Sequence, residues 1–495
     1  MSNRASHFPR IHLLVACLLL AVASAYAGEP KPTSDAASKP KRPNVLFIAV
    51  DDLNNWVGCM NGHPNAKTPN IDRLADRGVL FTNAHCQAPL CGPSRASLFS
   101  GLLPSTSGVY VQIKDRDLRK AGPPMRRCTF LPDYMERYGY TTMAAGKLFH
   151  EGDKANVFQQ HGPGMSFGPK PKERMHYDPK KLGKQGRTLT DWGAYPERDD
   201  QMPDYKTAEY AVEKLGKKHD KPFFLAVGFV RPHVPWHVPQ KWYDRHPVDG
   251  VQTPPYRKDD LEDVPKLARL LHSVPEMPTT EWAIQTGQWK DMVQAYLACC
   301  TFVDAQIGKV LTALEKSPYA DNTIIVLWSD HGYHLGEKNR FAKHALWDQA
   351  TKMPLIIVTP DQKVHFTSTA PVGLIDLYPT ILDLCHLPPN PANEGHSLVP
   401  LLKKPDAKWG HVAITTYGPN NHAIQTDRYR FYQYEDGSHE LYDHLKDPNE
   451  WENLAEKPSS QAIIQSLKKY LPKQNAPPAK KLHYPNSEYF LKFKK

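Results

Sequence analysis

The stretch NVLFIAVDD at residues 44–52 decides the fold. A continuous apolar run of strand length ends abruptly there in two adjacent carboxylates, Asp51 and Asp52. An uninterrupted apolar run predicts a strand buried on both faces, which requires helices on either side of a mainly parallel sheet. Three further runs of this kind, each followed by polar residues, span residues 323–328, 223–230 and 141–145.

Helical patterns lie between these predicted strands. They cover residues 69–77, 131–137, 205–215 and 292–314. The sequence therefore predicts an α/β fold with a large, mainly parallel or mixed sheet flanked by helices. Ligands in open α/β sheets bind beyond the carboxyl ends of the strands, so we expect a site at that edge. The polar residues that follow the strands are Asp51, Asp52, Lys147, His150, His233, Asp330 and His331.

Two segments interrupt the strand and helix pattern, and the pattern of apolar residues changes near the C-terminus. Residues 159–203 are rich in Pro, Gly and charge and predict a surface excursion, and residues 261–280 predict a second insertion. After about residue 405, short alternating runs predict a small antiparallel sheet closed by a helix near residues 460–470. We therefore expect a catalytic domain over residues 43–405 and a small C-terminal α+β subdomain over residues 406–495.

The N-terminus predicts export. Arg4 and Arg10 precede an apolar core at residues 11–24, and Ala25-Tyr26-Ala27 offers a small-x-small cleavage site. Cleavage near Ala27 would leave a disordered linker at residues 28–42 in a periplasmic or secreted protein, or in a lysosomal one if the source is eukaryotic. A lipoprotein signal around Cys17 and a short membrane anchor remain alternatives.

Charge and cysteine usage narrow the class of protein. The net charge of +10 falls to about +8 without Arg4 and Arg10 and favours an anionic partner, although a solvated basic surface is an equal alternative. No nucleic-acid motif is present, and outside the N-terminal segment no apolar run reaches the roughly 18 residues of a spanning helix, so neither nucleic acid nor stable membrane insertion is expected. The seven cysteines that cleavage would leave form no CxxC and no disulfide framework. Cys299 and Cys300 are expected in the core, and one pair elsewhere could form a disulfide.

Three carboxylates at two strand ends indicate a metal site. Asp51 and Asp52 would repel each other if buried together, so they require a cation or raised pKa values, unless they only terminate a strand. With Asp330 at the same edge, the oxygen donors favour Ca²⁺ or Mg²⁺ over zinc. Ca²⁺ is preferred because an exported protein meets it at useful concentrations.

The motif Cys91-Gly92-Pro93-Ser94-Arg95 resembles the Cys-x-Pro-Ser-Arg signature of type I sulfatases, members of the alkaline phosphatase superfamily. The motifs at the strand ends and Lys343 occur in the same order as in that family. The resemblance covers roughly residues 43–454. VRPHVPW, AAGKLFH and SDHGYHLGE most resemble the iduronate-2-sulfatase branch. One departure is Leu102, which stands where the family pattern Leu-Thr-Gly-Arg has its arginine.

The resemblance implies a mechanism. Cys91 would be oxidised to formylglycine by a formylglycine-generating or other sulfatase-maturing enzyme, and its hydrate would attack the sulfur of a sulfated sugar or glycan. The metal ligands would be Asp51, Asp52, residue 91, Asp330 and His331, although His331 could be a neighbour of the metal. Arg95 would hold the formylglycine hydroxyl, Lys147 and Lys343 would bind sulfate oxygens, His233 would protonate the leaving alkoxide, and His150 would assist release of the sulfate.

Alternatives to this mechanism remain. A phosphoester hydrolase could share the fold and the metal edge, and a non-catalytic polyanion-binding protein would keep Cys91 as a thiol. His150 and His233 could be ordinary surface histidines, and Lys343 could belong to a solvated charged run at residues 337–343.

Overall fold

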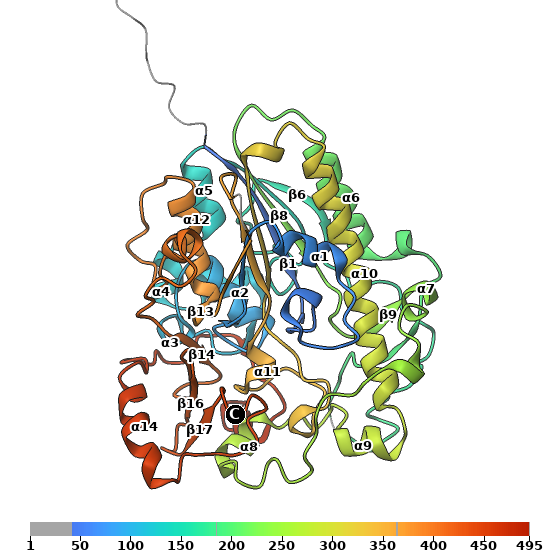
Figure 1. The fold of residues 1–495 in the computed structure, drawn as a ribbon, viewed down its shortest axis with the longest axis vertical. Coiled ribbons are helices and arrows are strands. Elements are labelled where there is room, and N and C mark those ends of the chain that lie inside the picture. The colour runs from blue at the N-terminus through green and yellow to red at the C-terminus, as the bar shows by residue number, and fades with distance from the viewer. Residues whose placement is uncertain (1–41, 185, 363–364, 495) are drawn as a thin grey trace, which may run out of the picture. The chain divides into compact units, whose positions relative to one another are not determined.

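An eight-stranded mixed sheet runs through the part of the chain that the computed structural model describes, residues 42–184, 186–362 and 365–494 (Figure 1). Helices cover both faces of this sheet (Figure 1). The strands, in spatial order, are β12 (Phe366–Ser368), β2 (Val79–Phe81), β11 (Leu355–Val358), β10 (Thr323–Ser329), β1 (Asn44–Val50), β8 (Phe223–Phe229), β5 (Thr141–Gly146) and β6 (Gln160–Gly164).

Strand β1 lies in the middle of the sheet and is parallel to both of its neighbours. Val50 is paired with Ser329 of β10 and with Phe229 of β8, so the three strands end at the same edge. β5 continues the parallel order beyond β8, whereas β11 is antiparallel to β10 and makes the sheet mixed. All four strands predicted from apolar runs are therefore confirmed, and their carboxyl ends converge as expected.

The side chains of β1 alternate between two apolar cores. Leu46, Ile48 and Val50 pack with helices α1 (Pro69–Ala75), α6 (Pro203–Leu215) and α10 (Trp289–Glu315) on one face. Val45, Phe47 and Ala49 pack with α2 (Cys91–Ser100), α5 (Leu131–Arg137) and α12 (Leu377–Leu384) on the other. Complete burial of each large side chain stabilises the fold by about 1.5–3 kcal/mol, which explains why the strands carry no polar alternation.

Helix α10 is long and apolar enough to cross a membrane by length and composition. However, 78% of its most apolar window is buried inside the protein, where it packs with α6, α1 and the sheet. Cys299 and Cys300 lie in this buried stretch, as expected. The apolar character of α10 is thus accounted for by the core of the fold.

Part of the predicted surface excursion belongs to the main sheet, which corrects the sequence-based expectation. β6 pairs in parallel with β5 at the sheet edge, and β7 (Trp192–Ala194) pairs with β9 (Trp236–Val238). The sequence of β6, QHGPG, lacks an apolar pattern because this edge strand is partly exposed. Gly162 is needed there, since an added Cβ would lie 2.6 Å from the ring of Tyr210. The second insertion contains the helix α8 (Lys266–His272).

The C-terminal part of the chain forms the predicted small antiparallel sheet with a helix. Three of its strands are β15 (His422–Gln425), β16 (Tyr429–Gln433) and β17 (His439–Asp443), and the helix is α14 (Gln461–Lys468). A fourth strand, β14 (Ala413–Thr416), pairs with β15 and was not predicted. Its sequence, AITT, is too short for a periodic signal.

Two sequence-based expectations concern disulfides and the N-terminus. Cys59, Cys86, Cys91, Cys128, Cys299, Cys300 and Cys385 are all free cysteines. Within the described residues no pair is bridged, so the possible disulfide is not present there. The predicted signal peptide and all but the last residue of the predicted linker lie outside the described residues.

Candidate active site

Cys91 is the first residue of helix α2 and is fully buried at the sheet edge. The next residue, Gly92, donates its amide to Gln112 Oε1 at 2.8 Å. A glycine is required here because an added Cβ would lie 2.2 Å from that oxygen. Ser94 Oγ donates to the backbone carbonyl of Asp330 at 2.6 Å and ties the helix to the end of β10. The small residues of the motif thus fix the start of α2 against the strand ends.

The back of α2 is held by apolar contacts. The ring of Phe99 stacks on Phe149 at 4.7 Å between centroids and meets Trp328 of β10 edge-on. Leu102, which replaces the arginine of the family pattern, is buried in the same core. The departure from the pattern therefore leaves a well-packed helix behind Cys91.

Three cationic side chains surround the Cys91 sulfur. Lys343 Nζ lies 3.2 Å, His331 Nε2 3.3 Å and Lys147 Nζ 3.6 Å from Sγ. Burial alone would raise the pKa of the Cys91 thiol, but Lys147, Lys343, His331 and a hydrogen bond from His150 lower that pKa well below its usual range. The site is therefore built to hold negative charge on the atoms around residue 91.

Arg95 and the two lysines balance three buried carboxylates. Arg95 Nε contacts Asp330 Oδ2 at 2.9 Å, and its Nη2 contacts Asp51 Oδ1 at 3.2 Å. Lys147 Nζ lies 2.5 Å from Asp51 Oδ2, and Lys343 Nζ lies 2.6 Å from Asp52 Oδ1. All six side chains are at most slightly exposed, so these charges interact with little screening by water.

The pKa values of Asp51 and Asp330 move in opposite directions. Burial raises the pKa of Asp51, but Lys147, His233 and Arg95 together hold it well below its usual range. Burial raises the pKa of Asp330 to about 7 despite the opposing charge of Arg95. The neighbouring protein charges therefore outweigh the burial of Asp51 but not that of Asp330.

The donor set fits a hard divalent cation. Ligand atoms of Asp51, Cys91, Asp330 and His331 all lie within 4.8 Å of one another, and so do those of Asp51, Asp52, Cys91 and His233. Asp52 Oδ2 is buried and has no hydrogen-bond partner among the described residues. An unpaired buried carboxylate oxygen is costly, and a cation would satisfy it. Asp52 also has a left-handed backbone, with φ of 61°, which marks a constrained position.

His331 lies where it could bind such a cation directly or stand next to it. Its Nδ1 donates to the Gly332 carbonyl at 2.9 Å, so in the neutral ring Nε2 offers its lone pair to the cluster. Burial lowers the pKa of His331, but Asp330 outweighs this and raises it to about 9. A cation that binds Asp330 would weaken this effect and favour the neutral, ligating form.

His233 and His150 lie on either side of this cluster. His233 Nδ1 donates to the Val234 carbonyl at 2.6 Å, which turns Nε2 towards Asp52 Oδ2 at 3.9 Å. The ring packs at 4.9 Å from Phe167, which also lies under the Lys147 ammonium. His150 contacts the Cys91 sulfur, and its Nδ1 has no partner among the described residues. Both histidines are therefore within the site and are not ordinary surface residues.

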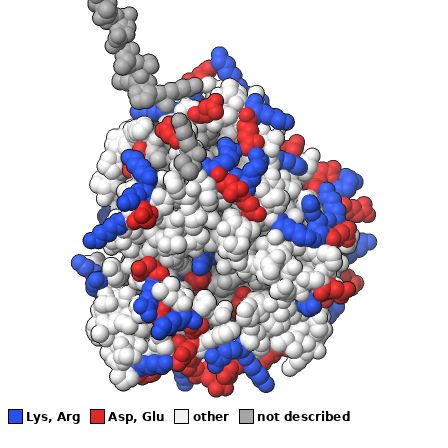
Figure 2. Space-filling view, viewed as in Figure 1, with Lys and Arg blue, Asp and Glu red and all other residues white. Residues whose placement is uncertain are grey.

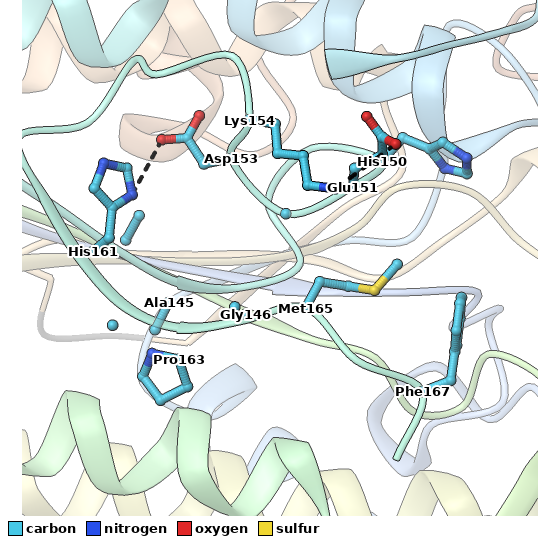
Figure 3. A pocket seen from close by; sticks show the side chains of 14 residues that line it. Ala145, Gly146, His150, Glu151, Asp153, Lys154, His161, Pro163, Met165 and Phe167 are labelled. Atoms are coloured by element: carbon cyan, nitrogen blue, oxygen red, sulfur yellow. Dashed lines mark ion pairs between the residues drawn. The ribbon is translucent and has the colours of Figure 1, made fainter. Parts of the chain in front are cut away.

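Two cavities adjoin the site on either side of the turn that carries His150 and Glu151. The larger, of about 510 Å³, is lined by His150, Phe167 and the β5–β6 region (Figure 3). Its wall holds the pairs Asp153–His161, 3.5 Å apart, and Glu151–Lys154, 3.9 Å apart (Figure 3). The smaller, of about 330 Å³, also contains His150 and Glu151 in its lining. His150 therefore links both cavities to the surroundings of residue 91.

The structure brings together every site residue predicted from the sequence. Lys343 is only 6% exposed and points into the cluster, so the alternative of a solvated face is wrong for this residue. Sequence reasoning missed Gln112 and His344, because backbone pairing and a left-handed turn place them and no motif marks them. Ser94 lies within the quoted motif, but its hydrogen bond to the Asp330 carbonyl was not predicted. The full set gathered at the edge is Asp51, Asp52, Cys91, Arg95, Lys147, His150, His233, Asp330, His331 and Lys343.

Known structures share this fold. A phosphonate monoester hydrolase of Agrobacterium radiobacter matches with a TM-score of 0.68 and 22% identity, over 87% of this chain and 95% of that chain. A solved 2-O glycosaminoglycan sulfatase matches with a TM-score of 0.66 and 24% identity, over 87% of this chain and 91% of that chain. These likenesses show an alkaline phosphatase-like fold, with helices on both faces of the large sheet.

Sequence comparisons are more specific. The family model described as Sulfatase matches residues 43–387, and that of the N-sulphoglucosamine sulphohydrolase C-terminal region matches residues 336–476. A sulfatase of Formosa agariphila is 49% identical over 92% of this chain and 91% of its own length. Mouse iduronate 2-sulfatase is 32% identical over 68% of this chain, which spans 62% of that relative's length. With a buried Cys-Gly-Pro-Ser-Arg motif among three carboxylates and two lysines, the chain belongs to the sulfatase family.

Proposed function

We propose that this sulfatase is exported and hydrolyses a sulfate ester of a carbohydrate, in the manner of an iduronate 2-sulfatase. The observation that carries the proposal is the buried Cys91, with two lysine ammonium groups within 3.6 Å of its sulfur. The likeness to mouse iduronate 2-sulfatase supports a sulfated uronate or related sugar as the substrate. On the face shown in Figure 2, Lys and Arg are interspersed with Asp and Glu, so the site and not a broad basic surface would select the anion.

Formylglycine at position 91 would supply the nucleophile. When hydrated, this aldehyde offers two hydroxyls on one carbon, one to attack sulfur and one to release the sulfate afterwards. Lys147 is paired with Asp51 and Lys343 with Asp52, and both ammonium groups lie next to residue 91. They would therefore bind the sulfate oxygens and stabilise the charge that develops on them. Arg95 donates to Asp51 and Asp330 and would keep the start of α2 in register with these groups.

The two histidines would handle protons. His233 is fixed through Nδ1, so a proton on Nε2 would face the departing alcohol oxygen. His150 contacts residue 91 from the cavity side, where it would accept a proton as the sulfate is released. Because Cys91 is fully buried, bulk water would have little access to the reacting atoms, and the charges of the site would act at full strength.

Ca²⁺ is the cofactor that we propose, held by Asp51, Asp52, residue 91, Asp330 and His331, with Mg²⁺ as the second choice. When bound, it would supply positive charge next to residue 91 and lower the pKa of a hydroxyl there. We expect Ca²⁺ to raise the melting temperature of the chelated wild-type protein, whereas Asp51→Ala should respond weakly. Asp153→Ala, a carboxylate in the neighbouring cavity, is the matched control. A stronger response to Mg²⁺ than to Ca²⁺ would contradict the choice of ion.

A mass measurement on the peptide that contains Cys91, taken from active protein, tests the nucleophile. We expect formylglycine in place of cysteine, and loss of sulfate release in Cys91→Ala. A thiol that persists in fully active material would refute the mechanism. A panel of defined sulfated mono- and disaccharides, assayed for released sulfate, would identify the sugar and the position of the ester.

A phosphoester hydrolase is the second candidate, because a phosphonate monoester hydrolase has the same fold. Comparing turnover of an aryl sulfate with that of the matching aryl phosphate separates the two reactions. A preference for the phosphate would favour the second candidate. A protein that binds sulfated glycans but turns over neither ester, with a thiol at Cys91, would instead be a polyanion-binding protein.

Export rests on the predicted signal peptide before Ala27. We expect the mature N-terminus near residue 28 in protein recovered from the periplasm or the medium. An uncleaved N-terminus, or a lipid on Cys17, would contradict this part of the proposal.

A further inference from the structure

The C-terminal tail, beyond residue 476, reaches the active site although it lies outside both family matches, which end at residues 387 and 476. Its strand β18 (Leu482–His483) is antiparallel to β4 (Gln112–Ile113). His483 is paired with Gln112, whose side chain accepts the hydrogen bond from Gly92. The tail is therefore one strand away from the start of the helix that carries Cys91.

The tail is firmly attached to the rest of the protein. Tyr489 and Phe490 are buried in an apolar cluster with Tyr110 and Tyr417. The Tyr489 hydroxyl donates to Glu435 Oε2 at 2.5 Å, and the Ala479 amide donates to the Gly108 carbonyl at 2.8 Å. These contacts on both sides of β18 hold residues 482–486 in a defined position.

The tail and the catalytic region line the cavity of about 330 Å³ together. His150, His344 and Lys114 line it from the catalytic region, and His483, Tyr484 and Asn486 line it from the tail. This volume falls within the roughly 300–1,000 Å³ of small-molecule sites. A mixture of planar polar groups, a lysine and an aromatic ring suits a sugar, which offers hydroxyls at its edge and C–H groups on its face.

Several polar groups of this cavity have no partner within the part of the chain that the structure describes. Lys114 makes no ion pair or side-chain hydrogen bond among the described residues, whereas its neighbours Asp115 and Asp117 are both hydrogen-bonded. Glu276 accepts from Asn486 through Oε1, but no described residue offers a partner to its buried Oε2 or to His344 Nδ1. Buried polar atoms that are left unpaired favour a ligand that can satisfy them.

We propose that this cavity is the subsite for the sugar ring that carries the sulfate ester, with the tail residues His483 and Asn486 and the lysine Lys114 as its specificity-determining groups. Lys114 would bind the anionic substituent of the ring, and the tail side chains would bind its hydroxyls. The inference rests on the proposed function, because it assumes that the ester is attached to a sugar.

Binding to an inactive background tests the subsite without turnover. In Cys91→Ser loaded with Ca²⁺, the dissociation constants of a 2-O-sulfated uronate disaccharide and of inorganic sulfate would be measured by calorimetry. We expect His483→Ala and Lys114→Gln each to weaken disaccharide binding by about tenfold, since each removes a polar contact, and to leave sulfate binding unchanged. Arg116→Gln, an exposed residue outside the cavity, removes the same charge as Lys114→Gln. Lys492→Ala alters the tail where it pairs with Glu435, and both controls should bind as the background does.

The outcomes separate the two levels of the proposal. Equal disaccharide affinity in the cavity variants and in the controls would overturn the subsite, as would a parallel loss of sulfate and disaccharide binding. Binding of sulfate without any binding of the disaccharide would also overturn it. A further outcome is that the Cys91→Ser background binds the disaccharide as expected but the wild-type protein releases no sulfate. This result would contradict the proposed function and leave the subsite in place.

Discussion

Residue 91 shows how single side chains make an anionic centre tolerable inside a protein. Three carboxylates and a thiol with a lowered pKa are buried together, which would be prohibitive without compensation. Arg95, Lys147 and Lys343 supply that compensation within hydrogen-bonding distance. In the proposed mechanism, a bound cation would compensate the carboxylates and leave these ammonium groups available to sulfate oxygens, so the same charges would serve both stability and substrate binding.

Replacing His233 tests the role of proton donation. A sugar alkoxide leaves poorly without a proton, whereas a phenolate leaves readily. We expect His233→Ala to lower kcat on a sugar sulfate by about 10²–10⁴-fold and to affect an aryl sulfate much less. His161→Ala, in the neighbouring cavity, is the control. Initial rates on both substrates decide the matter, and an equal loss on both would argue against an acid at this position.

Helix α10 supplies a cap to another helix across the interior. Helix α1 begins after Thr68, whose side chain makes no capping hydrogen bond. Asp304 of α10 takes its place, since Oδ1 accepts from the Ile71 amide at 2.8 Å and from the Asn70 amide at 3.0 Å. An acceptor for the first free amides of a helix is therefore provided by tertiary structure.

Removing this cap should destabilise the protein in a pH-dependent manner. Asp304→Ala leaves two amides unpaired, and we expect a loss of about 3 kcal/mol in the free energy of unfolding at pH 4. Burial raises the pKa of Asp304 to about 6, above its value in the unfolded chain, so the wild-type carboxyl contributes less stability as the pH rises from about 4 to 6. The loss should therefore be smaller at pH 7, as denaturant titrations at both values would show. Asp321→Ala, an exposed carboxylate, should have little effect at either pH, and a loss that grows with pH would contradict the argument.

The sequence predicts those elements whose own residues are continuously apolar and therefore buried. β1, β10 and β8 are buried on both faces, so their apolar runs predict them, and the polar residues that follow them predict the site. β6 and β14 escape prediction because pairing with a neighbouring strand defines them, and their own composition does not. Gln112 and His483 are missed for the same reason, since a two-residue ladder carries no periodic signal.

At the scale of the whole molecule, the small sheet is joined to the catalytic region through a buried arginine. Arg430 of β16 is fully buried, and its guanidinium donates to the Leu346 carbonyl at 2.7 Å and to Thr351 Oγ1 at 2.6 Å. Those acceptors lie in the segment that follows Lys343. The segment that follows Lys343 is thus tied to the C-terminal sheet, while the predicted boundary between residues 405 and 406 stays a prediction.

Arg430 should be essential for cooperative folding of both parts. We expect Arg430→Met to lower the free energy of unfolding by about 3–5 kcal/mol, because it leaves buried acceptors and carboxylates without their partner. Arg428→Met, two residues away, removes an arginine that is 41% exposed and paired with Asp443, so it should cost about 1 kcal/mol or less. Wild-type protein should unfold in a single calorimetric transition. Two separate transitions, or equal effects of the two variants, would show that the parts are stable independently.

The complete burial of Cys91 has a consequence for biosynthesis. All ten residues of α2 are buried, and β4, which contacts the helix, is itself paired with β18 of the tail. The formylglycine proposed at position 91 would therefore have to form before this region folds, because a modifying enzyme could not reach a sulfur that is fully buried.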